Sequence, residues 1–157
     1  MMTLPRACFL FQGLSEQQIK ALDAIAIAKT VKQDQWLFRE GESALAFYVL
    51  LNGAVELVAR VDEGFDLPIQ MLRSGGDCCG IAALLPPYVY NLAARCANQA
   101  QVLVLKKEDL ESLFQQDKQL NLAIMSNMSR HLLDSLNETR RELRIHFKTL
   151  SDSADII

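Results

Sequence analysis

The residues best suited to chemistry form one run, residues 75–85, which reads Gly-Gly-Asp-Cys-Cys-Gly-Ile-Ala-Ala-Leu-Leu. The glycine pair allows a tight turn, and Gly80 allows another part of the backbone to approach before an apolar helical turn begins. The first N–H groups of that turn have no partner inside it, so they could hold an anion. The same glycines would also suit a corner in an all-β core, and their spacing alone does not decide between the two interpretations.

Cysteine and histidine are the other residues that could do chemistry, and the chain contains few of them. They are Cys8, Cys78, Cys79, Cys96, His131 and His146. They show no Cys-x-x-Cys motif, metal-ligand spacing or pairing of a nucleophile with a base, which predicts neither an enzyme nor a metal site. Successive strand residues point to opposite faces, so the adjacent pair Cys78 and Cys79 is a poor chelate. The pattern favours a buried structural role, with redox chemistry or haem ligation as the alternative.

The elements that must position residues 75–85 are a helix and a series of short strands. Ser15 and Gln18 form a capping-box pattern, which predicts a helix start at residue 15. Apolar or alternating segments that predict strands follow at residues 30–32, 36–39, 46–51, 54–60, 67–72, 93–97 and 102–105. Asn52-Gly53 is a strong hairpin signal and is expected to join two of them. Strands at spacings of about ten residues, with glycine at the corners, indicate a sandwich or a barrel.

The order of these motifs resembles the cyclic nucleotide-binding domain family, with its catabolite activator protein-like β-roll. The resemblance runs from about Leu14 to Leu113 and is carried by Phe38-Arg39-Glu40-Gly41-Glu42, residues 47–55, Gly76-Asp77, Gly80 and Ala83-Leu84-Leu85. It implies a mainly β fold, a double-stranded β-helix or jelly roll with flanking helices and a long C-terminal helix. It also implies that residues 75–85 are the phosphate-binding cassette. The ligand-binding positions that it implies are Gly80, Ile81, Ala82, Ala83, Leu84, Tyr90, Asn91 and Leu92.

Two polar anchors of the family cassette are missing from this chain. In the family, a Glu takes the ribose 2′-hydroxyl and a later Arg pairs with the cyclic phosphate. Ile81 stands at the Glu position, and Tyr90 or Asn91 stands at the Arg position. Arg95 lies four or five residues too late, so it is read as a solvated strand arginine or as an alternative anion anchor. We therefore expect cyclic AMP and cyclic GMP to bind weakly or not at all.

A long helix is predicted over residues 117–147, where no glycine or proline interrupts the chain. A heptad seam runs along it at Leu122, Met125, Leu132, Leu136 and Leu143. Such a seam predicts a dimer interface. A second apolar set, expected to pack on the β-roll, consists of Leu120, Ile124, Met128 and Leu133. A helix that is apolar on two sides must bury both, so a second copy of the chain is the expected partner.

The implied organisation is one domain, with the β-roll and its short helices in residues 1–116, the dimerisation helix in 117–147 and a tail in 148–157. Half of the 157 residues are apolar and 22% are charged, as is usual for a soluble globular chain. A net charge of −3 argues against a large nucleic-acid surface, and no apolar run is long enough to cross a bilayer. Only ten residues follow the predicted helix, too few for the helix-turn-helix of transcription factors with this fold. We therefore expect a cytoplasmic protein that contacts neither DNA nor a membrane and whose cysteines are reduced.

Together these features predict a non-catalytic regulatory or ligand-sensing module that acts as a homodimer. Its partners would be a second copy, a small-molecule ligand and a partner protein that the sequence does not identify. No motif demands a cofactor, and a cyclic nucleotide is the ligand that the family resemblance implies. Three alternatives stay open: a cyclic AMP or cyclic GMP receptor with a non-standard phosphate anchor, a haem or redox sensor, and a structural dimeriser with an empty pocket.

Overall fold

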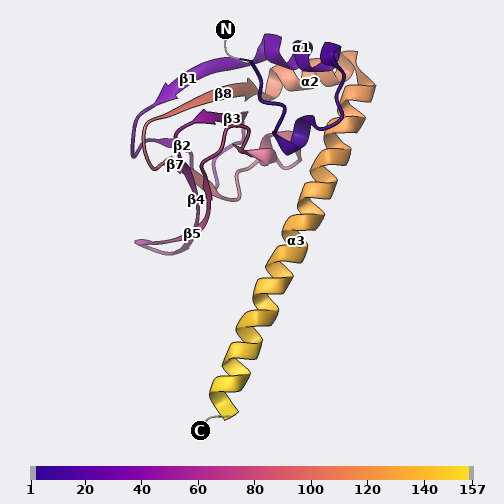
Figure 1. Ribbon diagram of the computed structural model, residues 1–157. Coiled ribbons are helices and arrows are strands. Elements are labelled where there is room, and N and C mark those ends of the chain that lie inside the picture. The colour runs from indigo at the N-terminus through magenta and orange to yellow at the C-terminus, as the bar shows by residue number, and fades with distance from the viewer. Residues whose placement is uncertain (1–2, 156–157) are drawn as a thin grey trace.

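Two four-stranded antiparallel sheets form a roll in residues 3–155, which the computed structural model describes (Figure 1). The first sheet has the order β1 (Ile27–Val31), β8 (Ala100–Lys106), β3 (Ala46–Asn52), β6 (Cys78–Cys79). The second has the order β2 (Trp36–Phe38), β7 (Ala93–Cys96), β4 (Val55–Asp62), β5 (Phe65–Leu72). The helices are η1 (Phe9–Phe11), α1 (Glu16–Ile25), η2 (Ile81–Leu84), α2 (Lys107–Gln116) and α3 (Lys118–Asp155). The predicted class, a mainly β jelly roll with a long C-terminal helix, is confirmed.

Helix α1 begins where the sequence predicts because its first turn is capped in both directions. The Ser15 Oγ accepts a hydrogen bond from the Gln18 N–H at 3.1 Å, and the Gln18 side chain accepts one from the Ser15 N–H at 3.0 Å. These bonds supply partners for N–H groups that a helix leaves open at its start. Ile19 and Leu22 then bury the apolar face of α1 against α2 and β8.

Asn52 and Gly53 do not form the predicted hairpin. Strand β3 pairs with β8 and β6, whereas β4 pairs with β5 and β7, so the two strands lie in different sheets. Gly53 carries the chain across at a φ of +96°, where a Cβ would meet the Gln99 carbonyl oxygen at 2.5 Å. A two-residue hairpin turn of the Asn-Gly type needs a positive φ at both residues. Gly53 has one, but Asn52 stays extended in β3, where it is paired with Gln101 of β8.

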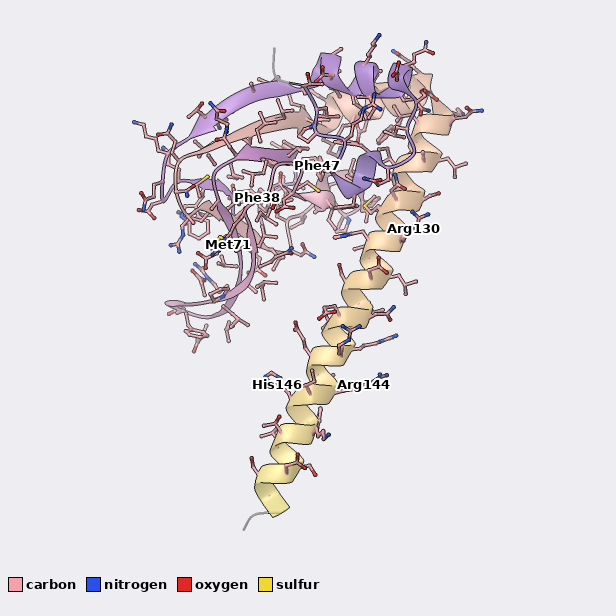
Figure 2. All side chains as sticks on the ribbon, viewed as in Figure 1. Phe38, Phe47, Met71, Arg130, Arg144 and His146 are labelled. Atoms are coloured by element: carbon pink, nitrogen blue, oxygen red, sulfur yellow. The ribbon has the colours of Figure 1, made fainter. Side chains whose placement is uncertain are left out.

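Strand β3 lies between two hydrophobic clusters. Phe47 and Val49 point into the first, which the helices and the first sheet share. Tyr48 and Leu50 point into the second, which fills the roll between the sheets and also holds Phe38. This alternation follows from the two-residue period of a strand. Figure 2 labels Phe47 and Phe38, one from each cluster.

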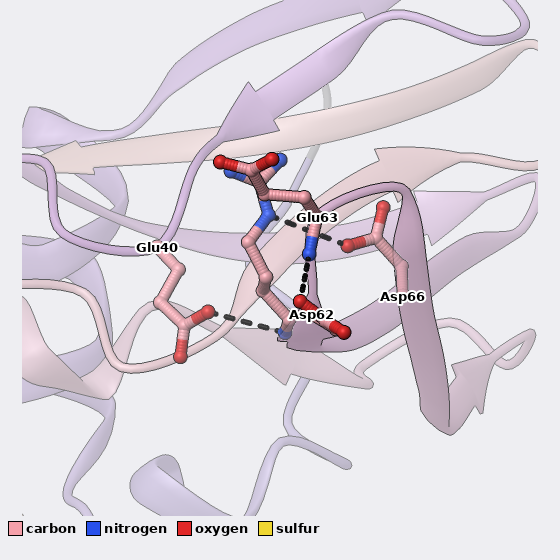
Figure 3. Close-up of polar contacts among 5 residues, drawn as sticks. Glu40, Asp62, Glu63 and Asp66 are labelled. Atoms are coloured by element: carbon pink, nitrogen blue, oxygen red, sulfur yellow. Dashed lines mark hydrogen bonds and ion pairs between the residues drawn. The ribbon is translucent and has the colours of Figure 1, made fainter.

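The β4–β5 hairpin extends from the roll and is exposed along most of β5. Polar contacts shape its tip (Figure 3). The Glu63 N–H donates to the Asp62 carboxylate at 2.7 Å, and the Arg60 N–H donates to the Glu40 carboxylate at 3.2 Å. The Arg60 guanidinium lies 3.7 Å from the Asp66 carboxylate. Because these groups are exposed, they fix the shape of the turn and contribute little to the stability of the domain.

Helix α3 is buried only near its start. Leu120, Ile124 and Met128 are at most 2% exposed and pack in the first cluster. The Asn127 amide donates to the carbonyl oxygens of Leu10 at 2.8 Å and Gln12 at 2.9 Å, which ties the helix to the N-terminal segment. Farther on, the helix extends well beyond the roll (Figure 1), and Figure 2 places Arg144 and His146 on that part.

Two predictions for α3 are wrong. Leu133 does not pack on the roll and is 56% exposed. It follows Ile124 by nine residues, which is two and a half turns, so it lies on the opposite face. Residues 148–155 are not a separate tail, because no glycine or proline stops the helix before Asp155. Within residues 3–155, no helix is long and apolar enough to cross a membrane.

Candidate ligand cavity

A cavity of about 980 Å³ lies between the roll and α3. On the side of the roll it is lined by Phe38, Leu57, Ile69, Gln70, Leu72, residues 76–82 and residues 90–92. On the side of α3 it is lined by His131, Leu132, Asp134, Ser135, Glu138, Thr139 and Glu142. Ala7 and Phe9 border it from the N-terminal segment. This size suits a ligand as large as a nucleotide.

Strand β6 and the one-turn helix η2 form the cassette side of the cavity. Gly80 joins them in the left-handed region at a φ of +87°, and a Cβ there would meet the Ala46 carbonyl oxygen at 3.0 Å. The Ala83 N–H donates back to the Gly80 carbonyl at 3.0 Å, so this N–H is already used inside the turn. The predicted turn, short strand and helical turn are therefore all present.

The predicted ligand positions divide between two cavities. Those that line the large cavity are Gly80, Ile81, Ala82, Tyr90, Asn91 and Leu92. Ala83 and Leu84 instead line a smaller cavity of about 240 Å³, between the cassette and helices α2 and α3. Both are buried, so they shape the cassette from behind. The binding roles of these residues stay predictions.

Tyr90 is fixed in the floor of the large cavity. It is 4% exposed, and its ring stacks on Phe38 with centroids 3.8 Å apart. Its hydroxyl donates to the Ala46 carbonyl at 2.6 Å and accepts from the Ala46 N–H at 3.2 Å. Burial raises the pKa of Tyr90 to about 12, so the hydroxyl keeps its proton at neutral pH. A locked, neutral ring therefore stands at one of the two positions where the family resemblance implies a cation.

Arg95 is not among the residues that line the cavity. It lies on β7 opposite Glu56 of β4, and its guanidinium is 3.5 Å from the Glu56 carboxylate. The same guanidinium lies over the Trp36 ring, 5.4 Å from its centroid. Its neighbours Ala94 and Cys96 are buried, so strand alternation directs Arg95 outward. The geometry fits a strand arginine and gives no support to the alternative anchor.

The wall that α3 contributes is acidic. Asp134, Glu138 and Glu142 recur every four residues and so share one helix face. Asp77 also lines the cavity from the cassette side, and its carboxylate accepts hydrogen bonds from the Arg73 N–H at 3.1 Å and the Ser74 N–H at 3.0 Å. The lining, as far as residues 3–155 define it, contains no lysine or arginine, although Arg141 pairs with Glu138 at 3.2 Å. A ligand here meets carboxylates and aromatic rings.

The α3 wall was missed from the sequence, although a signal for it was present. The face that buries Ile124 continues, at spacings of three and four residues, through Met128, His131, Ser135, Glu138 and Glu142. A helix face that is apolar where it is buried and polar farther along is typical of a helix that leaves a core and borders a cavity. The leucine seam, which shares only Leu132 with the cavity lining, carried the stronger periodic signal.

The N-terminal segment closes one end of the cavity. The Phe9 ring stacks on His131 of α3, with centroids 3.8 Å apart and planes 9° from parallel. Burial lowers the pKa of His131, and the Asp134 carboxylate opposes that shift. The imidazole therefore favours its neutral form in the folded chain.

A family model described as Cyclic nucleotide-binding domain matches residues 28–117, which is more than half of the chain. The chain belongs to the cyclic nucleotide-binding domain family. The anaerobic regulatory protein of Bacillus subtilis (strain 168) is 26% identical over 135 residues, which are 86% of this chain and 56% of that protein. This family member thus spans a little over half the length of that curated relative.

Solved structures of the family share its fold. The catabolite activator protein of Thermus thermophilus has a TM-score of 0.73 and 23% identity, over 87% of this chain and 62% of that one. The sensor domain of the transcriptional regulator DNR from Pseudomonas aeruginosa has a TM-score of 0.67 and 22% identity, over 85% and 89% of the two chains. At these identities the likeness establishes the fold alone.

The family resemblance predicts that this chain keeps the glycines of the cassette but lacks its two polar anchors. Ile81, at the predicted Glu position, is half-buried and packs beside the first cluster. Asn91, next to the locked Tyr90, is exposed and borders the cavity. In the described residues, no group of three or more His, Cys, Asp or Glu side chains is placed to hold a metal ion.

Proposed function

We propose that this family member is a non-catalytic ligand-sensing module whose cavity does not bind cyclic nucleotides tightly. The observation that carries the proposal is the charge of the cavity lining. The described residues that line it include four carboxylates and no lysine or arginine. Ile81 offers no acceptor to a ribose hydroxyl, and the Tyr90 hydroxyl is already bound to Ala46.

A cyclic nucleotide would lose two interactions in such a cavity. A buried phosphate without its paired cation costs about 2–5 kcal/mol. A ribose hydroxyl left without a partner costs about 1–3 kcal/mol more. Together these losses correspond to roughly two to six powers of ten in affinity. Repulsion by the carboxylates of α3 acts in the same direction, and water screens it because they are exposed.

The same lining suits a neutral or positively charged ligand with a flat, apolar body. The stacked rings of Phe38 and Tyr90 lie in the floor, where a planar group can pack. Glu138 and Glu142 lie on the opposite wall and attract a cation. Aromatic faces attract cations as well, so floor and wall favour the same class of ligand.

We further propose that the module acts as a cytoplasmic homodimer through α3. The exposed members of the predicted seam are Leu122, Leu132, Leu136 and Leu143. Met125 packs partly against the first cluster, so the unpartnered seam lies mainly beyond it. Leu150 is 66% exposed and extends the seam by one more heptad. A helix with apolar side chains bare on one face indicates a protein partner. The expectation of no contact with DNA stays a prediction.

Isothermal titration calorimetry on the unmodified protein tests the ligand proposal. For cyclic AMP and cyclic GMP we expect no binding in the low micromolar range. Three probes with the same indole ring then separate charge from shape: tryptamine is a cation, 3-methylindole is neutral and indole-3-acetate is an anion. We expect tryptamine to bind at least as tightly as 3-methylindole, and indole-3-acetate to bind most weakly.

Each other outcome favours one of the alternatives. Low-micromolar binding of cyclic AMP would replace the proposal with a cyclic nucleotide receptor, and Arg95→Ala would then test for a remote anchor. A Soret band in protein purified from a haem-replete host would favour a haem sensor. A dimer that binds none of the five compounds would favour a structural dimeriser.

A further inference from the structure

Two cysteine thiols from distant parts of the chain meet beside the cavity. The Sγ atoms of Cys8 and Cys78 are 3.3 Å apart, although 70 residues separate them in the sequence. Cys8 is fully buried, whereas Cys78 is half-buried and lines the cavity. All four cysteines of the chain are free thiols. A disulfide has an S–S distance of about 2.05 Å, so the two sulfurs need to approach by only about 1.3 Å.

We propose that Cys8 and Cys78 form a reversible disulfide, which fastens the N-terminal segment to strand β6 of the cassette. This site goes beyond the ligand proposal and does not depend on it. Disulfides in reducing compartments are usually catalytic or redox-sensing. A buried thiol beside a more accessible one is the arrangement that such a site needs, because the accessible thiol meets the oxidant and the buried one completes the bond.

The backbone on both sides of the contact is already held in place. The Cys8 carbonyl accepts a hydrogen bond from the Phe11 N–H at 3.0 Å. A Cβ on Gly76 would meet the Cys8 backbone nitrogen at 3.1 Å, so the N-terminal segment lies directly against the cassette turn. Cys78 is paired with Val49 in the β3–β6 ladder. The backbone therefore holds the two sulfurs beside each other in the folded chain.

The other two cysteines provide an internal comparison. Cys79 and Cys96 are both buried in the second cluster, inside the roll. Burial raises the pKa of each of these thiols, which keeps them protonated. Cys79 points away from Cys8 because adjacent strand residues face opposite sides of the sheet. We expect these two thiols to stay reduced when Cys8 and Cys78 are oxidised.

A small disulfide such as oxidised glutathione can form the bond in two balanced steps. The Cys78 thiolate attacks one sulfur of oxidised glutathione, the glutathione S–S bond breaks, and one glutathione leaves as a thiolate. The Cys8 thiolate then attacks the Cys78 Sγ and displaces the second glutathione. The two protein thiols lose two electrons in total, and their two protons end on the two glutathione thiols.

The protonation of the pair sets the rate of this exchange. The hydrogen bond with Cys8, and then burial, raise the pKa of Cys78, and the nearby Cys79 and Asp77 act in the same direction. Because the thiolate is the attacking species, oxidation should be slow at neutral pH and faster in alkali. Such a pair responds to sustained oxidation.

The bond would hold together three elements that border the cavity. Phe9, the neighbour of Cys8, stacks on His131 of α3, and Cys78 belongs to β6. Ala7, Phe9 and Cys78 all line the cavity, so oxidation would stiffen its rim. The bond would also close a long loop, which removes conformational freedom from the unfolded chain. The oxidised chain should therefore melt at a higher temperature.

Disulfide mapping on the native protein tests the proposal. The protein is incubated with excess oxidised glutathione at about pH 8.5, near the usual pKa of a thiol. Free thiols are then alkylated, and tryptic peptides are analysed by mass spectrometry. We expect the free thiols to fall from four to two, with residues 7–20 linked to residues 74–95. Oxidation should raise the melting temperature by roughly 5 °C, and dithiothreitol should reverse both changes.

Variants assign the bond to the two cysteines. Cys79→Ala and Cys96→Ala are matched controls and should keep both the link and the melting shift. Cys8→Ala and Cys78→Ala should lose both; if either fails to fold by circular dichroism, the wild-type map and the two controls still decide. Four free thiols after prolonged oxidation would overturn the proposal. So would a bond from Cys79 to Cys78 or Cys96, or a glutathione that stays on Cys78 without a link to Cys8.

Discussion

The two walls of the cavity differ in how completely their side chains are buried and hydrogen-bonded by contacts within the chain. In the floor, Tyr90 is buried, stacked on Phe38 and hydrogen-bonded twice to Ala46. On the opposite wall, α3 presents exposed carboxylates such as Glu138 and Glu142, and the leucine seam beside them is bare. The floor is therefore complete within one chain, whereas the helix wall has the character of a surface that meets a ligand or a second copy.

Helix α3 itself passes from a buried environment near its start to an exposed one farther along. Near its start, Leu120 and Ile124 are buried, and Asn127 binds two carbonyls of the N-terminal segment. These contacts anchor the helix at one end. A helix without tertiary packing is only marginally stable in water. The exposed length of α3 is therefore the part most open to stabilisation by a partner.

The largest expected effect comes from placing the family's cation in the floor. Tyr90→Arg would lose the stack on Phe38, remove the hydroxyl bonds to Ala46 and bury a charge. We expect it to lower the free energy of unfolding by about 3–5 kcal/mol. Tyr90→Phe keeps the ring and should cost about 1 kcal/mol. Urea denaturation measures both variants, and equal losses would mean that the hydroxyl bonds hold the floor and that packing does not.

Sequence patterns predicted the parts of the fold that depend on neighbouring residues. The capping box of Ser15 and Gln18 and the turn around Gly80 are local, and each forms where it was expected. Asn52-Gly53 was misassigned as a hairpin for a physical reason. The dipeptide permits a turn with left-handed backbone at both residues, but only Gly53 adopts it, and Asn52 stays extended in β3, where it pairs with Gln101, 49 residues away.

The cavity was less predictable because its properties depend on contacts that are distant in the sequence. The Tyr90 hydroxyl is occupied by Ala46, 44 residues away, and the carboxylates of the opposite wall come from α3, far along the chain from the cassette. The acidic wall exists because α3, after its buried start, runs past the roll (Figure 1) and carries its carboxylates to the cavity. Periodicity identified the faces of that helix but not which face meets the cavity.

The predicted dimer seam of α3 can be tested with substitutions at residues that do not line the cavity. Leu136→Glu with Leu143→Glu would place four like charges across a two-fold helix pair. We expect the dimer to dissociate, because an unpaired charge buried in the interface costs on the order of 3–5 kcal/mol. The monomer fold should keep its stability, because both leucines are exposed in a single chain. Sedimentation velocity at micromolar concentration measures the association.

A charge-matched control isolates the seam. Leu133→Glu with Asn137→Glu adds the same two charges to exposed positions of the same helix that do not belong to the predicted seam. This control should remain a dimer. A wild-type chain that sediments as a monomer, or a control that dissociates as readily as the seam variant, would remove the helix dimer from the proposal.

Restoring the two missing anchors tests whether their absence or the acidic wall of α3 prevents cyclic nucleotide binding. Asn91 is exposed and borders the cavity, so Ile81→Glu with Asn91→Arg restores both groups and leaves the Tyr90 stack intact. We expect at least a tenfold gain in affinity for cyclic AMP, which is about 1.4 kcal/mol, measured by calorimetry. The uncharged pair Ile81→Gln with Asn91→Met is the matched control. A folded variant with no gain would mean that the acidic wall of α3 dominates over the missing anchors.

The smallest expected effect is at His131, where wall and N-terminal segment meet. Burial lowers the pKa of His131 below its ordinary value of 6.5, so the folded chain prefers the neutral imidazole. The unfolded chain then binds the proton more readily, and stability falls as the pH falls through the window from 6.5 down to the lowered native pKa. Below that window the imidazole is protonated in both states, and the loss is complete.

His131→Phe keeps a ring against Phe9 and removes this proton site. The slope of the free energy of unfolding against pH, measured by urea denaturation between about pH 5 and 7, should therefore become shallower. The change should be small because the imidazole is partly exposed and Asp134 offsets part of the penalty. His146→Phe, on the exposed end of α3, is the matched control. If the two variants changed the slope equally, the stacked contact between Phe9 and His131 would have no part in the acid sensitivity of the fold.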